Sequence, residues 1–226
     1  MSIITVKDEY YQQWQLMPGV TEKWQADTSQ LEHPGRKRVA ELVLANSKSV
    51  LDVACGVGVD YHLFYKDNGI KYMGIDVTEK FIDVAKSNGV PCMMANALKL
   101  PFPDKSFDSV ICKDLLLHLP PNAWRTVLSE MARVAKKQVV ILDDAWQQGT
   151  IYMIREKYAA LDPESKQIKE LMFFNNIYGM HDVLTYASEL GLTVQVYPGM
   201  TVKKVVPEGG SPDTYERSQI TVYTKN

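Results

Sequence analysis

Short apolar segments alternate with amphipathic segments through the middle of this chain. Runs that are apolar almost throughout are typical of strands buried on both faces of a parallel sheet, and they cover residues 49–54, 71–75, 91–95, 107–112 and 138–143. Amphipathic segments that predict helices cover residues 60–68, 78–88 and 121–136. Because crossovers between parallel strands are right-handed, this alternation predicts a doubly wound α/β fold.

The pattern differs at the two ends of the chain. Helices are predicted first at residues 8–16 and 34–46, then at 149–161, 164–174 and 180–190. Two late strands, 193–197 and 219–224, have only a turn-rich loop between them, so they are expected to pair antiparallel. We therefore expect one domain over residues 1–226, with a mostly parallel seven-stranded sheet and an antiparallel last strand. A helical cap is expected over residues 145–181.

Composition narrows the class of protein. The 226 residues are 46% hydrophobic and 23% charged, with a net charge of −2, as in one ordinary globular domain without general attraction to nucleic acid. The three cysteines form no paired or zinc-binding spacing. No signal peptide or membrane-spanning run is evident. We expect a reduced cytoplasmic protein, a monomer or homodimer, with no membrane or nucleic-acid partner and no metal.

A glycine loop follows the first buried strand, in the segment Asp52–Gly58. Glycines at such a turn let the backbone approach a ligand in the crevice at the carboxyl ends of the strands. A dinucleotide-binding loop would carry a third glycine where this chain has Tyr61, and the acid at Asp52 suits a cationic ligand rather than a pyrophosphate. A tight turn without any ligand is the alternative.

Further motifs follow in order. Asp76 ends the second strand about 20 residues beyond the loop, the spacing at which an acid meets ribose hydroxyls. The segments Asn96–Phe102 and Phe107–Cys112 come next. Together, residues from about 49 to 145 resemble the class I, Rossmann-like S-adenosylmethionine-dependent methyltransferases, in their small-molecule subgroup. The resemblance implies S-adenosylmethionine as cofactor and S-adenosylhomocysteine as product.

The same resemblance implies roles for individual residues. The methionine part of the cofactor would be held by Asp52, by the backbone of Ala54, Cys55, Gly56 and Gly58, and by Lys113. Asp76 would bind the ribose, and the adenine would lie among Val77, Asn96, Ala97 and Leu98. Asn96 stands where an aspartate is usual in the family, although its carbonyl can still accept a hydrogen bond from the adenine amino group.

Catalysis needs little beyond holding a nucleophile in line with the transferred methyl, and a base helps when that nucleophile is protonated. His118, on the rim of the expected site, is the candidate base, and a structural role in its loop is the alternative. Asp143 and Asp144 end the fifth strand, where only one of them can face the site. We take Asp144 as the second catalytic candidate.

Aromatic residues at two places are candidates for binding the methyl acceptor. The resemblance implies that residues 1–46 form a helical lid over the cofactor, which carries Tyr11 and Trp14. It also implies that the 145–181 insertion, with Trp146 and His181, covers the acceptor pocket. Core packing of these aromatic residues is the alternative. Their character favours an apolar or aromatic acceptor.

We therefore expect methyl transfer to an O or N atom of a small, partly apolar or aromatic metabolite. A methyltransferase acting on RNA or protein is the second hypothesis. A non-catalytic S-adenosylmethionine-binding scaffold or sensor is the third. A dinucleotide-dependent oxidoreductase is disfavoured because the third glycine is missing.

Overall fold

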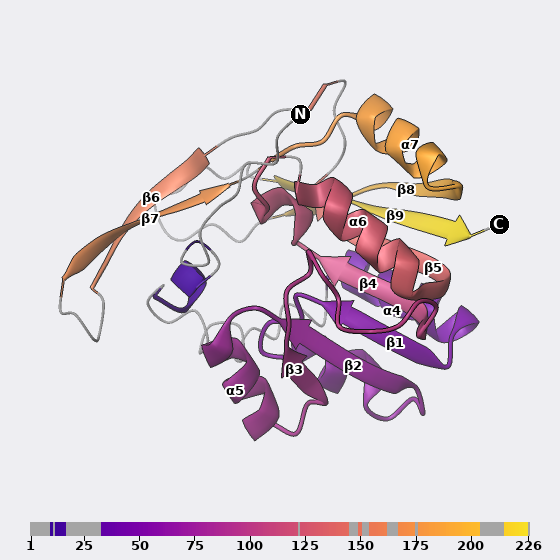
Figure 1. The fold of residues 1–226 in the computed structure, drawn as a ribbon, viewed down its shortest axis with the longest axis horizontal. Helices are drawn as coiled ribbons and strands as arrows, with labels where there is room; N and C mark the ends of the chain where they lie inside the picture. Colours follow the sequence, from indigo (N-terminus) through magenta and orange to yellow (C-terminus); the bar gives the residue numbers. More distant parts are fainter. Residues whose placement is uncertain are drawn as a thin grey trace.

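A seven-stranded sheet is the centre of the computed structural model, which describes residues 10, 12–16, 33–121, 123–144, 149–150, 154–161, 167–174, 176–203 and 215–225. Its strands lie in the order β3-β2-β1-β4-β5-β9-β8 (Figure 1). They are β1 (Ser49–Val53), β2 (Lys71–Asp76), β3 (Cys92–Met94), β4 (Phe107–Lys113), β5 (Ala135–Asp144), β8 (Leu192–Lys203) and β9 (Tyr215–Lys225). Strands β1 to β5 are parallel, and β9 runs antiparallel to both β5 and β8. The predicted doubly wound sheet with an antiparallel last strand is confirmed.

Helices cover both faces of this sheet. They are α4 (Pro34–Asn46), α5 (Glu79–Ser87), α6 (Ala123–Val134) and α7 (Met180–Glu189), with short turns η1 (Gln13–Leu16), η2 (Tyr61–Tyr65) and η3 (Leu116–His118). In Figure 1, α6 lies in front of the sheet and α4 behind it. Along β4, Val110 and Cys112 therefore pack with α6, while Ile111 packs with α4. Burial on both faces explains why the strands are apolar throughout.

Two element boundaries differ from the sequence prediction. The helix expected over residues 60–68 is a single π-helical turn, and β5 begins at Ala135 rather than near 138. The first residues of β5 include exposed Lys136 and Lys137, each 4.0 Å from the carboxylate of Asp108. Basic residues are favoured in the last turn of a helix, so Lys136 and Lys137 led to the prediction that the helix continues to residue 136.

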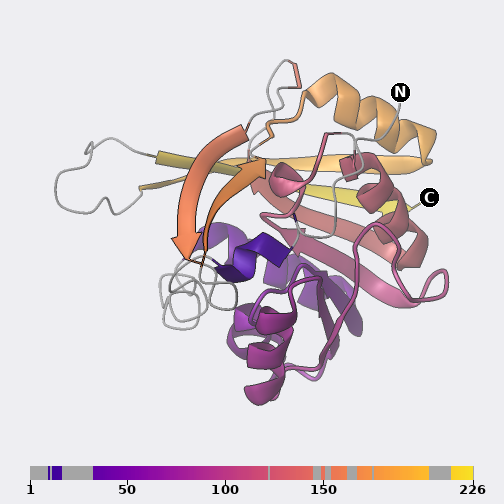
Figure 2. The same cartoon turned by 60° about the vertical axis from the view of Figure 1, so that its left-hand side comes forward.

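The predicted helical cap over residues 145–181 is wrong in its secondary structure. The helices expected at 149–161 and 164–174 are instead an antiparallel hairpin of β6 (Ile154–Leu161) and β7 (Ile168–Phe174). Apolar residues in these segments recur at helical spacing, but pairing between the segments satisfies their backbone groups, and such tertiary context overrides local propensity. Figures 1 and 2 show the hairpin standing away from the sheet.

The two ends of the segment that carries the hairpin are fastened together. The backbone N–H of Gly179 donates to Thr150 Oγ1 at 2.8 Å, and the Thr150 hydroxyl donates to the carboxylate of Asp182. A Cβ atom at Gly179 would lie only 2.9 Å from the backbone nitrogen of Thr150, so only glycine allows this approach. We call this closure the neck, formed by Thr150, Gly179 and Asp182.

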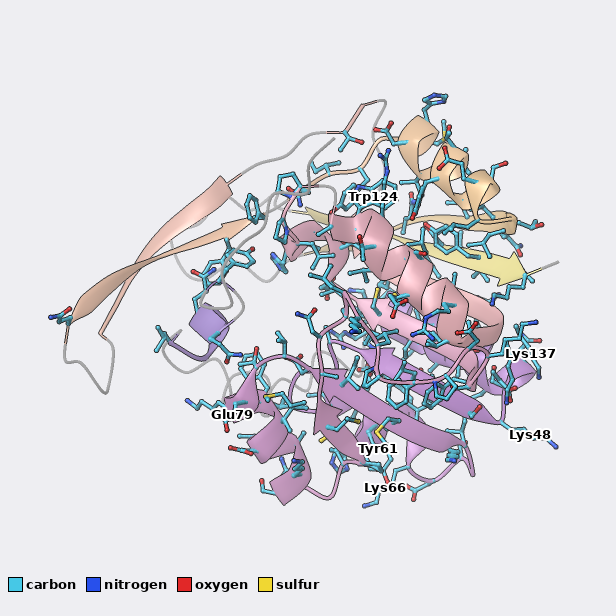
Figure 3. The ribbon with its side chains drawn as sticks, viewed as in Figure 1. Lys48, Tyr61, Lys66, Glu79, Trp124 and Lys137 are labelled. Carbon is cyan, nitrogen blue, oxygen red and sulfur yellow. The ribbon has the colours of Figure 1, made fainter. Side chains whose placement is uncertain are left out.

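Trp124 anchors α7 against α6. Its ring lies 5.3 Å from that of Tyr178, just before α7, and 5.5 Å from that of Tyr186 on α7. Figure 3 shows Trp124 on the side of α6 that faces α7. Among the described residues, no helix has both the length and the apolar character to cross a membrane.

Candidate active site

A cavity of about 340 Å³ lies at the carboxyl ends of the first four strands. Its wall is built mainly from the segments that follow those strands, residues 53–57, 75–78, 95–97 and 113–115. This is the crevice in which open α/β sheets bind their ligands. The position predicted from the glycine loop therefore coincides with a cavity large enough for a small molecule.

The glycine loop contributes both wall and packing. Ala54, Cys55 and Gly56 line the cavity, and Ala54 and Gly56 have left-handed backbone angles, with φ of 62° and 56°. Gly58 does not line it among the described residues. A Cβ atom there would lie 2.6 Å from a methyl group of Val90, so the second glycine is required by packing.

Asp76 is a buried carboxylate on the cavity wall, with only 8% of its surface exposed. Its Oδ2 accepts the backbone N–H of Gly56 at 3.0 Å, and its Oδ1 accepts that of Thr78 at 2.9 Å. Burial raises the pKa of Asp76, although these two donors act in the opposite direction. Each oxygen keeps a further lone pair, so the fixed carboxylate can accept hydroxyl groups from a ligand.

The residues predicted to surround the adenine are only partly brought together. Val77, Asn96 and Ala97 line the cavity, while Leu98 does not among the described residues. The backbone N–H of Leu98 instead donates to Asn96 Oδ1 at 2.9 Å. Asn96 is therefore held in a local turn by its carbonyl oxygen, the atom that the sequence analysis assigned to the adenine.

Asp52 does not line the cavity, contrary to the contact that was expected with the methionine part of the cofactor. Its side chain is 1% exposed, and its two oxygens accept hydrogen bonds from Tyr72 Oη at 2.9 Å and from Lys113 Nζ at 2.8 Å. Lys113 does line the cavity, but its ammonium is also 3.0 Å from Asp60 Oδ2. The loop acid thus holds the lysine in place beneath the cavity.

These buried charges stabilise one another. Burial alone would lower the pKa of Lys113, but the carboxylates of Asp52 and Asp60 outweigh it and raise that pKa, so the lysine stays charged. Burial alone would raise the pKa of Asp60, but Lys113 and Arg36 hold it below its ordinary value. Asp52 differs, because burial raises its pKa despite the bond from Lys113.

Arg36 and His33 line the cavity, and the sequence analysis missed both. One guanidinium nitrogen of Arg36 lies 2.9 Å from Asp60 Oδ1, and the other lies 3.5 Å from Asp114 Oδ2. His33 caps α4, since its Nδ1 accepts the backbone N–H groups of Gly35 and Arg36 at 3.1 and 3.3 Å. Pro34 at the helix start was the available signal, because it places both side chains at the positive end of α4.

Tyr10 lines the cavity and connects three parts of the structure. Its hydroxyl donates to the backbone carbonyl of His118 at 2.6 Å and accepts the backbone N–H of Phe174 from the hairpin at 3.1 Å. Nearby, Gln12 Nε2 donates to the carbonyl of Val77 at 2.8 Å. Within the predicted lid, Tyr10 and Gln12 therefore contact the cavity wall.

His118 lines the cavity with a defined ring orientation. Its Nδ1 lies 2.8 Å from the backbone carbonyl of Phe174, which can only accept, so Nδ1 carries the proton of this hydrogen bond. In the neutral ring, Nε2 is then the basic nitrogen. Asp144, the other catalytic candidate, ends β5 opposite Ser218, and its side chain lies outside the description.

The acceptor-binding candidates are not assembled around this cavity in the described structure. Tyr11 and Trp146 lie outside the described residues, and only the backbone of Trp14 is described, in η1. His181 is exposed near the start of α7 and is not among the described residues that line the cavity. Tyr10, Leu115 and Leu119 do line the cavity, and neither leucine stood out in the sequence.

Comparison with known proteins matches the central part of the chain to a family. Residues 50–138 match the family described as a methyltransferase domain, and they contain the glycine loop, Asp76 and His118. Residues 50–138 thus match a methyltransferase domain, and the order of the strands is that of the Rossmann-like fold that the motifs indicated.

Curated relatives and solved structures agree with this assignment. The O-methyltransferase resE of Aspergillus sclerotiorum is 31% identical over 113 residues, which are 46% of this chain and 42% of that protein. A demethylmenaquinone methyltransferase of Bacillus licheniformis is 31% identical over 131 residues, 54% of this chain and 51% of that protein. The chain thus spans about half the length of these curated relatives.

Among solved structures, the magnesium protoporphyrin IX methyltransferase of Synechocystis PCC 6803 has a similar fold. Its TM-score is 0.63 at 14% identity, and the likeness covers 100% of each chain. That structure was solved with S-adenosylmethionine bound. At this identity the likeness concerns the fold alone.

Proposed function

We propose that this chain transfers a methyl group from S-adenosylmethionine to an O or N atom of a small, partly apolar or aromatic metabolite. The observation that carries the proposal is the buried Asp76 carboxylate, fixed by Gly56 and Thr78 on the wall of a 340 Å³ cavity. S-adenosylmethionine supplies an electrophilic methyl group on a sulfonium. The residues of the chain bind and orient the two reactants.

The charge of the cavity supports a cationic ligand. Among the described residues that line it or lie directly beneath, two cations face four carboxylates, namely Arg36 and Lys113 against Asp52, Asp60, Asp76 and Asp114. A cleft of negative charge attracts positively charged ligands and repels polyphosphates. The same balance that favours a sulfonium therefore disfavours a dinucleotide.

Calorimetry with S-adenosylhomocysteine is the direct test. Wild-type protein should bind it, Asp76→Ala should bind it at least tenfold more weakly because the lost hydrogen bonds involve a charged group, and NADH should not bind. Asp83→Ala is the matched control, since Asp83 is an exposed carboxylate on α5. Absence of binding by wild type, or equal binding by Asp76→Ala, would contradict the proposal.

Arg36 and His33 are proposed to receive the carboxylate of the methionine part. Both lie at the positive end of α4, where His33 presents an Nε2–H because its Nδ1 is an acceptor. Arg36→Gln should weaken S-adenosylhomocysteine binding but leave 5′-methylthioadenosine binding unchanged, because the latter has no carboxylate. Arg38→Gln, on the exposed side of the same helix, should alter neither. Equal losses for both ligands would place Arg36 elsewhere.

His118 is proposed as the general base for the acceptor. The hydrogen bond to Phe174 holds Nδ1 as the donor, so the neutral ring presents Nε2 as the proton acceptor. With an acceptor in hand, His118→Gln should lower kcat by about 10²-fold or more and remove the acidic limb of the pH–rate profile. A retained acidic limb would assign His118 a structural role in η3. Asp144 remains a second candidate, for which the same profile of Asp144→Asn is the test.

The acceptor wall supports a small apolar or aromatic acceptor. Leu115 and Leu119 line it, and the ring of Tyr10 packs 5.4 Å from that of Phe174. Incubation with labelled S-adenosylmethionine and separate metabolite, RNA and protein fractions tests the choice. Label in RNA or protein alone would reverse it, and tight cofactor binding without labelling of any fraction would favour a scaffold or sensor.

A further inference from the structure

Asp114 is the acidic residue of the cavity whose carboxylate is least buried. It follows β4 directly, lines the cavity, and its side chain is 47% exposed. Its backbone has a left-handed φ of 54° and is fixed there by the N–H bond to the carbonyl of Leu142 at 3.0 Å. Non-glycine residues with such angles are uncommon and gather at functional sites. The backbone thus holds this carboxylate at the cavity mouth.

The neighbouring charges are already committed to other partners. Lys113 is held by Asp52 and Asp60 at 2.8 and 3.0 Å. Arg36 is bonded to Asp60 at 2.9 Å and approaches Asp114 only to 3.5 Å. A methionine carboxylate bound to Arg36 would neutralise the cation that lies 3.5 Å from Asp114, and no other cation is paired with Asp114 among the described residues.

Two further polar side chains that line the cavity, those of Tyr10 and His118, donate their protons within the protein. Tyr10 gives its hydroxyl proton to the carbonyl of His118, and Nδ1 of His118 gives its proton to the carbonyl of Phe174. A ligand that binds the carboxylate of Asp114 must bring a hydrogen-bond donor of its own.

We propose that Asp114 determines acceptor specificity by binding a cationic amine of the methyl acceptor, next to an apolar part that contacts Leu115 and Leu119. This inference rests on the proposed function, because it requires the donor to occupy Arg36. An acceptor with a carboxylate at the same position would meet Asp114 as a like charge. Asp114 acts here by positioning the acceptor, and no bond forms or breaks at it.

Three fragments that share a phenyl ring test this proposal: 2-phenylethylamine, 2-phenylethanol and phenylacetate. Their binding to the protein saturated with S-adenosylhomocysteine is measured by ligand-observed NMR titration. Wild type should prefer the amine over the alcohol and the alcohol over the carboxylate. In Asp114→Asn the advantage of the amine over the alcohol should fall about two- to fivefold, the range for a partly exposed ion pair. Asp114→Lys should prefer phenylacetate.

Asp67→Asn is the matched control, because Asp67 is an exposed carboxylate outside the cavity lining, and it should keep the wild-type order. Binding of S-adenosylhomocysteine by each variant shows that the donor site is folded. If wild type fails to bind it, the proposed function fails. If it binds while the amine has no advantage in wild type, or keeps its full advantage in Asp114→Asn, the role of Asp114 alone is overturned.

Discussion

Replacing Gly58 with alanine tests whether this glycine is required by its backbone conformation alone or also by the close packing of Val90. Gly58 has a left-handed φ of 79°, and a Cβ atom there would lie 2.6 and 2.8 Å from the two methyl groups of Val90. Gly69 has a φ of 66° with no atom within 4 Å of its Cβ position. Gly69→Ala therefore measures the backbone cost alone, about 1–2 kcal/mol. Gly58→Ala adds the steric overlap.

Val90 cannot move aside at low cost. Its side chain is 4% exposed, and a β-branched side chain has few χ1 rotamers available. Overpacking of a buried site costs roughly 1–3 kcal/mol. We therefore expect Gly58→Ala to lower the free energy of unfolding by about 2–5 kcal/mol, and to exceed Gly69→Ala by about 1–3 kcal/mol.

Urea unfolding of Gly58→Ala, Val90→Ala and the double variant completes a double-mutant cycle. The double variant should be more stable than the sum of the single losses predicts, by about 1–3 kcal/mol, because the new methyl group fills the space that Val90 leaves. Equal losses for Gly58→Ala and Gly69→Ala, or additive losses in the cycle, would refute the packing explanation.

Three further predictions concern the buried charges and the lid. Lys113→Met should lower the free energy of unfolding by about 3–5 kcal/mol, since it leaves Asp52 and Asp60 without their shared cation. Adding Asp60→Asn should recover part of this loss in the same urea assay. No recovery would contradict the stabilising role of the Lys113–Asp60 ion pair. Lys113 and Arg36 hold the pKa of Asp60 below its ordinary 3.8, although burial acts in the opposite direction. The contribution of Asp60 to stability is therefore present above pH 3.8 and is lost as the pH falls through the lowered pKa. Below pH 3.8 the unfolding free energy should fall less steeply with decreasing pH for Asp60→Asn than for wild type. Tyr10→Phe should lower the free energy of unfolding by about 1–3 kcal/mol, because the backbone N–H of Phe174 loses the hydroxyl to which it donates. Tyr186→Phe, on α7 and outside the cavity lining, is the control.

The parallel core of the fold could be predicted from the sequence because its signals are local. Strands buried on both faces are apolar throughout, and the glycine loop and Asp76 mark the ends of β1 and β2. Segment 145–181 could not be predicted in the same way. Its apolar residues recur at helical spacing, and the hairpin depends on pairing between β6 and β7, such as Tyr158 opposite Leu171.

The same distinction between local signals and tertiary contacts applies to the residues of the site. Residues at the carboxyl end of a strand, such as Asp76 and Lys113, could be placed near the cavity from that position. Arg36 and Tyr10 reach it from elements far away in the sequence, so their proximity is a property of the folded chain. Asp52 shows the opposite error: its position at the strand end was correct, but the pleat turns its side chain beneath the wall, toward Tyr72 and Lys113.

Because of the neck at Thr150 and Gly179, the hairpin can differ in length and sequence without changing the rest of the fold. Since the chain leaves and re-enters the body at nearly the same point, the length and sequence between these residues can change without moving β5 or α7. Asn176 and Tyr178 mark the limit of this freedom, because they bond to the carbonyls of Leu119 and Leu116. Exchange of residues 151–172 between related chains is therefore expected to leave β5, α7 and the cavity at the ends of β1 to β4 in place.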